Sequence, residues 1–256
     1  MREGPAGGNA VEKTLAVLGA LGDHERITDI VAATGLPKST VHRILQTLVA
    51  TGFARVDGGG GYGGGPNILR LAGRLLSRID LAQSAQLPLD ALRQRTGSTV
   101  HLALLNGDEA VYVAKLEGLK PYRMASRVGM ALPLHCTAIG KAILAQLPTE
   151  AVRSLVGRTG LPARTARTLT ELDDLLEHLE RVRQDGWAFD DEENERGVRC
   201  AGAAVHDHTG AVVGALSVSH LVVDDGAPAV SELGRAVVAA ASEVSATLGA
   251  AGGRPA

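Results

Sequence analysis

Residues 37–49 read PKSTVHRILQTLV, and this pattern predicts an amphipathic helix. Apolar side chains recur three and four residues apart, which places them on one side of a helix: Val41, Ile44, Leu45, Leu48 and Val49. The opposite side carries polar or basic side chains and no carboxylate: Ser39, His42, Arg43, Gln46 and Thr47. Pro37 suits the first turn of this helix, because the amide hydrogen that proline lacks would have no partner there.

A shorter helix is predicted just before it. Thr28 can serve as the N-cap of a helix over residues 29–34, and Gly35 suits the left-handed turn that ends it. Two helices joined by a tight turn are typical of a helix-turn-helix, whose second helix lies in the major groove of DNA. The alternative is an ordinary helix pair whose basic side is only solvated.

The charge distribution favours DNA binding. Residues 30–79 contain six basic residues and a single acidic one, Asp57, so this segment carries a net charge of +5. The whole chain carries −2, which leaves −7 for the remainder. A basic module on an acidic body is the electrostatic pattern of a nucleic-acid-binding domain attached to a second domain. Aromatic residues make up only 2% of the chain, which argues against stacking on single-stranded bases.

The flanking segments extend the motif to a winged helix. A first helix is predicted over residues 11–21, and the second helix of the motif ends at Thr51-Gly52. Residues 53–56 read as a short strand, Asp57 and four glycines follow, and Tyr62 opens the return strand. Such a hairpin is the wing of a winged helix, with Arg55 positioned to meet the phosphate backbone. The glycine run lacks the Gly-Lys-Ser or Gly-Lys-Thr of a P-loop.

A helix over residues 66–79 is predicted to link this domain to the rest of the chain. Its second apolar edge, Leu69 and Leu76, can pack on its own domain or against a second copy. Beyond Leu81 the pattern is mixed, with predicted strands over 99–105, 109–116, 201–206 and 212–219 and helices over 136–146, 171–185 and 228–248. The turns at 106–108 and 209–210 make two hairpins of the strands. The fold class is therefore α+β, an antiparallel sheet covered by helices.

The chain of 256 residues is long enough for two ordinary domains. We predict a disordered arm at 1–9, a winged helix-turn-helix at 10–65, a linker helix at 66–80 and a second domain at 81–250. No apolar run reaches 18 residues, and residues 1–10 lack the apolar core of a signal peptide. The two cysteines do not make a disulfide framework. These features predict a cytoplasmic protein.

Several stretches, in order and over nearly the whole chain, resemble the IclR-type bacterial transcriptional regulators. They are GLPKSTVHR at 35–43, the Gly52 and Tyr62 frame of the wing, PLHCTAIGKA at 133–142, DDEE at 190–193 with GVRC at 197–200, and ALSVS at 215–219. The resemblance implies a GAF-like effector-binding C-terminal domain. It also implies a dimeric or tetrameric repressor or activator of a metabolic operon, and no enzyme.

Two glycines depart from the family pattern. Gly64 stands where the return strand of the wing usually has a large apolar residue, and Gly61 stands where a basic residue is common. Because glycine weakens a strand and offers no side-chain contact, we expect a mobile wing, which either contacts DNA or leaves binding to the recognition helix.

The DNA contacts are predicted from the two motifs. Ser39, Thr40, His42 and Arg43 form the groove-facing set, with Thr47 on the same side and Arg43 reading a guanine edge. Lys38 and Thr28 are predicted to contact phosphates, and Arg55 and Tyr62 belong to the wing. A two-fold dimer presents two recognition helices, so the operator is predicted to be pseudo-palindromic.

The resemblance places the effector pocket at Gly129, Met130, Asp190, Val198, Cys200, Ser217 and Ser219. The strand pattern supports this placement in part, because Ser217 and Ser219 share one face of a strand while Leu216 and Val218 face the other way. Two such hydroxyls can bind a carboxylate or hydroxyl group, or they can bond to neighbouring backbone. We predict a small organic metabolite, an acid, as effector. Asp190 would repel a carboxylate unless it accepts a hydrogen bond from a ligand hydroxyl.

The remaining histidines and cysteines could in principle serve catalysis or metal binding. Cys200 with His206, or Cys136 with His135, could form a nucleophile–base pair, but no acyl-transfer motif accompanies them. His206 and His208 share a strand face yet lack further ligands at recognisable spacing, so neither a metal nor another cofactor is predicted. His101 is predicted to be a core or pocket-edge residue.

Overall fold

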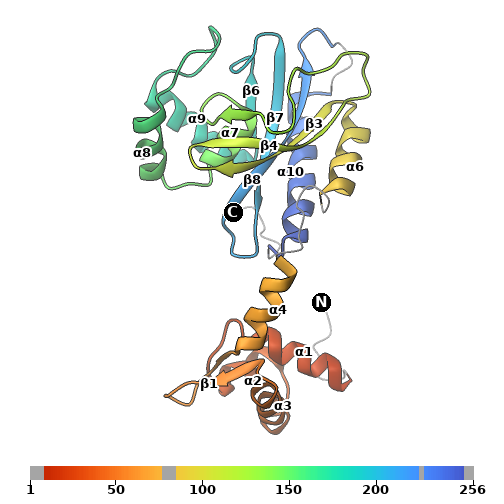
Figure 1. The fold of residues 1–256 in the computed structure, drawn as a ribbon, viewed down its shortest axis with the longest axis vertical. Helices are drawn as coiled ribbons and strands as arrows, with labels where there is room; N and C mark the ends of the chain where they lie inside the picture. The colour runs from red at the N-terminus through yellow and green to blue at the C-terminus, as the bar shows by residue number, and fades with distance from the viewer. Residues whose placement is uncertain (1–8, 77–84, 225–227, 251–256) are drawn as a thin grey trace. The chain divides into compact units, whose positions relative to one another are not determined.

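The computed structural model describes residues 9–76, 85–224 and 228–250. The chain divides into two compact units, Met1–Ile79 and Asp80–Ala256. The described elements of the first unit (Figure 1) are α1 Ala10–Ala20, α2 Ile27–Thr34, α3 Lys38–Ala50, β1 Ala54–Val56, β2 Tyr62–Gly64 and α4 Pro66–Leu76. The helix-turn-helix, the two-stranded wing and the start of the linker helix are thus confirmed as elements. Residues 77–80 of the predicted linker lie outside the described residues.

The first unit has its own small core. Val17 of α1, Ile30 of α2 and Val41 and Leu45 of α3 are fully buried in one apolar cluster. Asn9 opens α1 with a capping box: its side chain accepts the N–H groups of Val11 and Glu12, and the Glu12 carboxylate accepts the Asn9 N–H at 2.9 Å. Asn9, which was predicted to belong to the arm, is therefore the N-cap of α1, and the rest of the predicted arm, residues 1–8, lies outside the described part of the chain.

Two details of the helix boundaries were predicted wrongly. α2 begins at Ile27, so its N-cap position is Arg26 and Thr28 lies inside the first turn. The physical reason is that Ile27 packs against the core and is drawn into the helix. Pro37 occupies the N-cap position of α3, with extended backbone angles of −57° and 139°, one residue before the first turn.

The second unit is an antiparallel sheet with helices on both faces (Figure 1). Its described strands are β3 Thr99–Asn106, β4 Glu109–Leu116, β5 Ala131–Pro133, β6 Ala188–Asp191, β7 Val198–His206 and β8 Val212–Leu221. They pair in the order β5-β4-β3-β8-β7-β6. Its described helices are α6 Gln86–Thr96, α7 Ala138–Leu144, α8 Thr149–Thr159, α9 Leu172–Asp185 and α10 Val230–Thr247. The predicted α+β architecture is confirmed.

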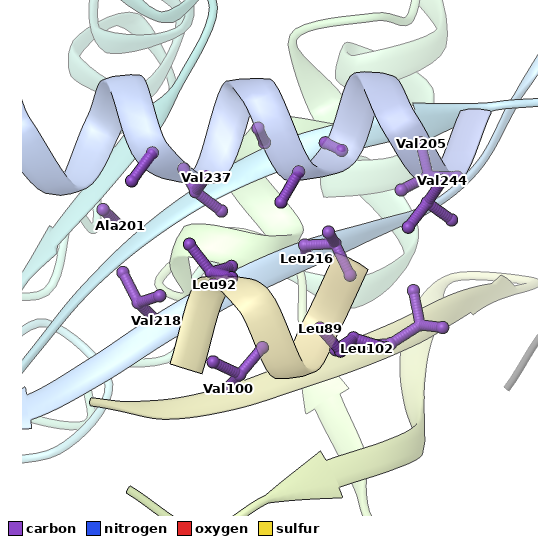
Figure 2. Packing of buried hydrophobic residues seen from close by; sticks show 14 of the residues in the cluster. Leu89, Leu92, Val100, Leu102, Ala201, Val205, Leu216, Val218, Val237 and Val244 are labelled. Atoms are coloured by element: carbon purple, nitrogen blue, oxygen red, sulfur yellow. The ribbon is translucent and has the colours of Figure 1, made fainter. Parts of the chain in front are cut away.

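The alternation along the strands divides the core into two layers. Leu216 and Val218 of β8 point toward α6 and α10 and join one buried cluster, as Figure 2 shows. Ala215, on the other face, belongs to a second cluster with α7, α8 and α9. Gly202 of β7 permits close approach of α7, because a Cβ there would lie 2.8 Å from the backbone of Ala138. Ser217 and Ser219 therefore lie on the α7 face, opposite Leu216 and Val218, as predicted.

Several predicted elements change length. The helix predicted over 136–146 is α7, which starts only at Ala138 because the Thr137 hydroxyl caps it by accepting the N–H of Gly140 at 3.0 Å. The strand predicted from 201 starts at Val198, where β7 already pairs with Leu221. The closing helix spans Val230–Thr247 within the predicted 228–248. Among the described residues no helix is long and apolar enough to span a membrane, and both cysteines are free.

Candidate nucleic-acid interface and small-molecule site

The turn before α3 fixes how this helix is presented. Gly35 adopts the left-handed conformation with φ of 66°, and its N–H closes α2 on the carbonyl of Val31 at 2.9 Å. The carbonyl of Pro37 then accepts the N–H groups of Thr40 and Val41, at 2.9 and 3.1 Å. The buried stripe of α3 turns toward the core, so its polar side is directed to solvent.

The polar side of α3 is free to make intermolecular contacts. Lys38, Ser39, His42 and Arg43 are exposed, and within the described chain their side chains form no hydrogen bond or ion pair. Thr47 is exposed too, but its hydroxyl donates to the carbonyl of Arg43 at 3.1 Å. Thr40 is half-buried. Thr28 lies on α2, where its hydroxyl donates to the Asp29 carboxylate at 3.1 Å.

The wing presents one basic side chain beside a tightly turned tip. Arg55 is exposed and lies opposite Gly63 in the β1–β2 register. The Asp57 carboxylate accepts the N–H groups of Gly59 and Gly61, at 3.1 and 2.8 Å, so it organises the glycine turn. Tyr62 is half-buried against the core of the first unit, and its N–H donates to the carbonyl of Glu25 at 2.7 Å. Tyr62 thus has a structural role whether or not it touches DNA.

In the second unit, cross-strand pairing aligns the predicted effector residues. Asp190 of β6 lies opposite Cys200 of β7, Cys200 opposite Ser219 of β8, and Ser219 opposite Thr99 of β3. Directly paired residues share a face, so these four side chains form a row across the sheet. The Cys200 thiol donates to the Ser219 hydroxyl at 3.1 Å. Val198 begins β7 two residues before Cys200 and therefore shares its face.

A second row runs beside the first on the same face. Ser217 lies opposite His101, and His101 lies opposite Lys115 of β4. The His101 ring stacks on Tyr112 with centroids 4.6 Å apart, and its Nε2 lies 2.7 Å from the Ser126 hydroxyl. We call these two rows the polar face of the sheet: Thr99, His101, Lys115, Asp190, Cys200, Ser217 and Ser219.

The loop that holds Gly129 and Met130 is attached to the polar face through Tyr112. The N–H of Gly129 donates to the Tyr112 carbonyl at 2.8 Å, and the Tyr112 N–H donates to the Met130 carbonyl at 3.1 Å. The same tyrosine stacks on His101, so the loop meets the second row. All seven predicted effector residues therefore lie on the polar face, at its end or on a loop pinned beside it.

Burial governs the charges here. Asp190 is 3% exposed, and burial raises its pKa to about 7. Two interactions oppose this rise by favouring the charged carboxylate: the hydrogen bond that it accepts from the N–H of Glu193 at 2.7 Å, and the positive charge of nearby Lys141. Lys141 of α7 is fully buried; it forms an ion pair with Glu193 and donates to the carbonyl of Phe189. Burial lowers the pKa of Lys141 and raises that of Glu193, and their attraction opposes both shifts.

Sequence reasoning missed most of the partners of this face. Lys141 was visible as a lone charge inside the apolar run AIGKAIL, and a buried lysine must be paired. Tyr112 and Ser126 carried no comparable signal. His101, expected at the core or a pocket edge, is 1% exposed, and its Nδ1 has no partner among the described residues. Burial, and to a lesser extent the positive charge of Lys115, lowers the pKa of His101 to about 3, so the ring is neutral.

The cysteines are not arranged as nucleophiles. Burial raises the pKa of the Cys136 thiol to about 12 and raises the pKa of Cys200 as well, so both stay protonated at neutral pH. His135 Nε2 lies 3.1 Å from the carbonyl of Pro162, and His206 Nε2 lies 3.3 Å from the Gln146 side chain, so neither histidine is paired with a thiol. Among the described residues no group of three or more His, Cys, Asp or Glu could hold a metal ion.

Comparisons with known proteins agree across both units. The model of the "IclR helix-turn-helix domain" matches residues 10–58, and that of the "Bacterial transcriptional regulator IclR C-terminal" matches residues 73–246. The chain is 37% identical to the HTH-type transcriptional regulator XynR of Escherichia coli over 84% of this chain and 88% of XynR. It is 35% identical to E. coli KdgR over 82% of this chain and 81% of KdgR.

A solved structure gives the same result for the fold. An ICLR transcriptional regulator from Silicibacter sp. TM1040 superposes with a TM-score of 0.84 at 25% identity. The match covers 95% of this chain and 97% of that chain.

Proposed function

The chain belongs to the IclR family of bacterial transcriptional regulators, and we propose that it controls a metabolic operon in the cytoplasm as a homo-oligomer on a pseudo-palindromic operator. The DNA-binding element is the helix-turn-helix, and the small-molecule effector binds in the C-terminal domain. The observation that carries the proposal is the exposed face of α3, on which Lys38, Ser39, His42 and Arg43 have no partner in the described chain.

The assigned contacts follow from the chemistry of each side chain. Arg43 reads a guanine edge by a bidentate pair, with Ser39, Thr40, His42 and Thr47 beside it in the groove. Other polar groups of the first unit contact the phosphate backbone: Thr28, Lys38, Arg55 and the wing residue Tyr62. Phosphate contacts position the protein, and base contacts give specificity.

For the effector we propose a small organic acid bound at the polar face of the sheet. Ser217 supports this most directly, because it is 3% exposed and its hydroxyl makes no hydrogen bond within the described chain. The effector needs no metal or other cofactor in this proposal. Asp190 no longer opposes a carboxylate, because with a pKa of about 7 it can carry a proton and donate a hydrogen bond.

Oligomerisation is supported by exposed apolar side chains on the first unit. Val11 and Leu15 of α1 are 66% and 60% exposed, and Leu69 of α4 is 75% exposed. Between these helices lies an apolar hollow of about 450 Å³, lined by Leu18, Leu21, Gly22, Phe53, Gly64, Ile68 and Leu71. Exposed apolar patches of this kind mark protein interfaces, and a second copy is the partner that a two-fold operator requires.

The test is a gel shift with DNA from the gene's own upstream region at two salt concentrations. Wild-type protein is expected to bind and to lose affinity steeply with salt. The logarithm of the binding constant should fall with the logarithm of the salt concentration, with a slope of roughly −0.9 per phosphate contact. Arg181→Ala, an exposed arginine of α9, is the control and should bind like wild type. Absence of binding in low salt, with and without a mixture of organic acids, would refute the proposal.

The effector assignment is tested in the same assay. Organic acids that release or tighten the wild-type complex should lose this effect in Ser217→Ala, while DNA affinity without ligand stays unchanged. Ser154→Ala, on the surface of α8, is the matched control. If Ser217→Ala responds like wild type, the effector does not bind the polar face.

A further inference from the structure

A basic hollow lies on the surface of the C-terminal domain, formed by residues that the proposed function does not use. It has a volume of about 800 Å³ and is lined by Arg164, Thr165, Ala166, Arg167, Glu192, Asn194, Glu195 and Arg196. We call it the arginine hollow. Its volume falls within the range of small-molecule sites in proteins.

Hydrogen bonds hold the two walls of the arginine hollow together. The Thr165 hydroxyl donates to the carbonyl of Glu192 at 2.7 Å, and the Thr168 hydroxyl donates to the carbonyl of Glu193 at the same distance. Thr168 also accepts the N–H groups of Arg164 and Thr165, at 3.0 and 2.9 Å. The guanidinium groups are therefore carried by a backbone that is fixed before any ligand arrives, which lowers the cost of binding.

The three arginines differ in how far they are already neutralised. Arg167 forms ion pairs with Asp191 and Glu192. Arg164 only donates from its Nε to the carbonyl of Asn194 at 3.3 Å, and Arg196 has no hydrogen bond or ion pair within the described chain. Two cationic side chains thus face the hollow without a carboxylate partner. Planar guanidinium groups are suited to bind carboxylate or phosphate oxygens.

The two glutamates of the lining partly offset the positive charge of the arginine hollow. Glu192 is engaged, because its carboxylate accepts the N–H of Gly197 at 2.8 Å and lies 3.6 Å from Arg167. The carboxylate of Glu195 has no hydrogen bond or ion pair within the described chain and is the group that would repel an anion. Arg164 and Arg196 outnumber it, so the unpaired charge of the hollow is positive.

We propose that the arginine hollow binds a small metabolite through a carboxylate or phosphate group, at a site separate from the polar face of the sheet. Asn194 lines the hollow, and its backbone N–H donates to the Asp190 carboxylate at 3.3 Å. An anion held between Arg164 and Arg196 therefore adjoins the loop that orients Asp190. Anion binding at the arginine hollow does not depend on where the effector binds or on DNA binding.

The experiment is calorimetric titration of the full-length protein with inorganic phosphate and, separately, with succinate, at constant ionic strength. Saturable binding of at least one of them is expected, and the two arms show whether phosphate or carboxylate is preferred. Arg196→Gln should weaken binding by about tenfold or more, the value of a lost charge-assisted hydrogen bond. Glu195→Gln should tighten it, because the repulsive carboxylate is removed.

Two controls separate this site from a general charge effect and from the effector site. Arg153→Gln changes an exposed arginine of α8 outside the hollow and should leave the affinity unchanged. Ser217→Ala should leave the affinity for phosphate unchanged, because the effector proposed for the polar face is an organic acid. No saturable binding of either anion, an equal loss in Arg153→Gln, or a loss of phosphate binding in Ser217→Ala but not in Arg196→Gln would each overturn the proposal. None of these outcomes depends on DNA binding, so the proposed function is tested separately.

Discussion

Arg43 is exposed on α3 with its guanidinium unpaired in the described chain, whereas Lys38 lies at the start of the same helix. The two positions predict different losses. Arg43→Ala should weaken binding to the cognate operator by about 1–3 kcal/mol and hardly affect unrelated DNA, because a bidentate base contact discriminates sequence. Lys38→Ala should weaken both kinds of DNA alike and reduce the salt slope. Titrating both variants on cognate and scrambled DNA checks this; equal losses for Arg43→Ala would assign it a phosphate contact.

Asp190 gives a pH dependence with a definite sign. Its pKa is about 7 in the folded protein against 3.8 for an ordinary aspartate, since burial disfavours the charged form. The folded state therefore binds a proton that the unfolded state has released between these values. The stabilising contribution is complete below pH 3.8 and is lost as pH rises through about 7, with a slope of the order of 1 kcal/mol per pH unit.

Asp190→Asn should remove this slope. Its amide oxygen can still accept the N–H groups of Glu193 and Asn194, so the loop keeps its hydrogen bonds. We expect the free energy of unfolding of the variant, relative to that of wild type, to increase from pH 5 to pH 8. Urea unfolding of both proteins at the two pH values measures this change. Lys141, Glu193 and the two protonated thiols surround Asp190 in both proteins. A constant difference between the two proteins at both pH values would show that Asp190 is not the titrating group.

At the scale of elements, the wing contains two adjacent glycines with opposite requirements. Among the described residues, a Cβ on Gly64 would meet only the Ile68 side chain, at an ordinary 3.6 Å; Gly64 also helps to line the apolar hollow. A Cβ on Gly65 would lie 2.3 Å from the carbonyl oxygen of Gly52. Gly64, where the family usually has a large apolar residue, therefore leaves space for a side chain. At position 65, in contrast, close packing requires glycine.

We predict that Gly64→Val stabilises the first unit by about 0.5–2 kcal/mol, because it fills a hollow and favours the strand. Gly65→Ala should destabilise the same unit by about 1–3 kcal/mol or more. Hydrogen exchange of peptides from α3 and the wing measures both effects without unfolding the second unit. If Gly64→Val lowers protection as Gly65→Ala does, the hollow cannot accept a side chain.

Local patterns predicted the elements that carry their own signal. The period of α3, the glycine after α2 and the alternation of β8 were all readable, and the structure confirms them. β6, with the sequence AFDD, was not predicted, because it is a strand only through its pairing with β7. α6 was missed as well, since its sequence QLPLDALRQRT places a proline in the first turn and has a weak apolar stripe.

The same limit applies to the candidate site. The shared face of Ser217 and Ser219 follows from a period of two within one strand. The contact of Ser217 with the row of His101, and the burial of Lys141 against Glu193, depend on pairing between segments far apart in the chain. Strand register across such distances is set by tertiary packing, so no local pattern in a single sequence gives it.

On the scale of the whole molecule, each unit has its own buried core; the DNA contacts are assigned to the first unit, and the effector site and the arginine hollow are assigned to the second. Binding to DNA and binding to the effector are therefore distinct equilibria that are coupled through the chain. Linkage requires that the coupling be reciprocal: an effector that lowers operator affinity by a given factor must bind the operator complex more weakly by the same factor.

Leu69 allows the oligomeric proposal to be tested without altering either ligand surface. It is 75% exposed on α4, and a charge there should be tolerated by the isolated unit but not by an apolar contact between two copies. Leu69→Glu is predicted to give a smaller species in sedimentation. It should also lose most of the gain in affinity that a two-half-site operator has over a single half-site, because the second half-site is bound intramolecularly only by a dimer. Leu87→Glu, at an 82% exposed position of α6, is the matched control. If Leu87→Glu dissociates the protein and Leu69→Glu does not, the subunits associate through the sheet domain and the apolar surface of α1 and α4 has another role.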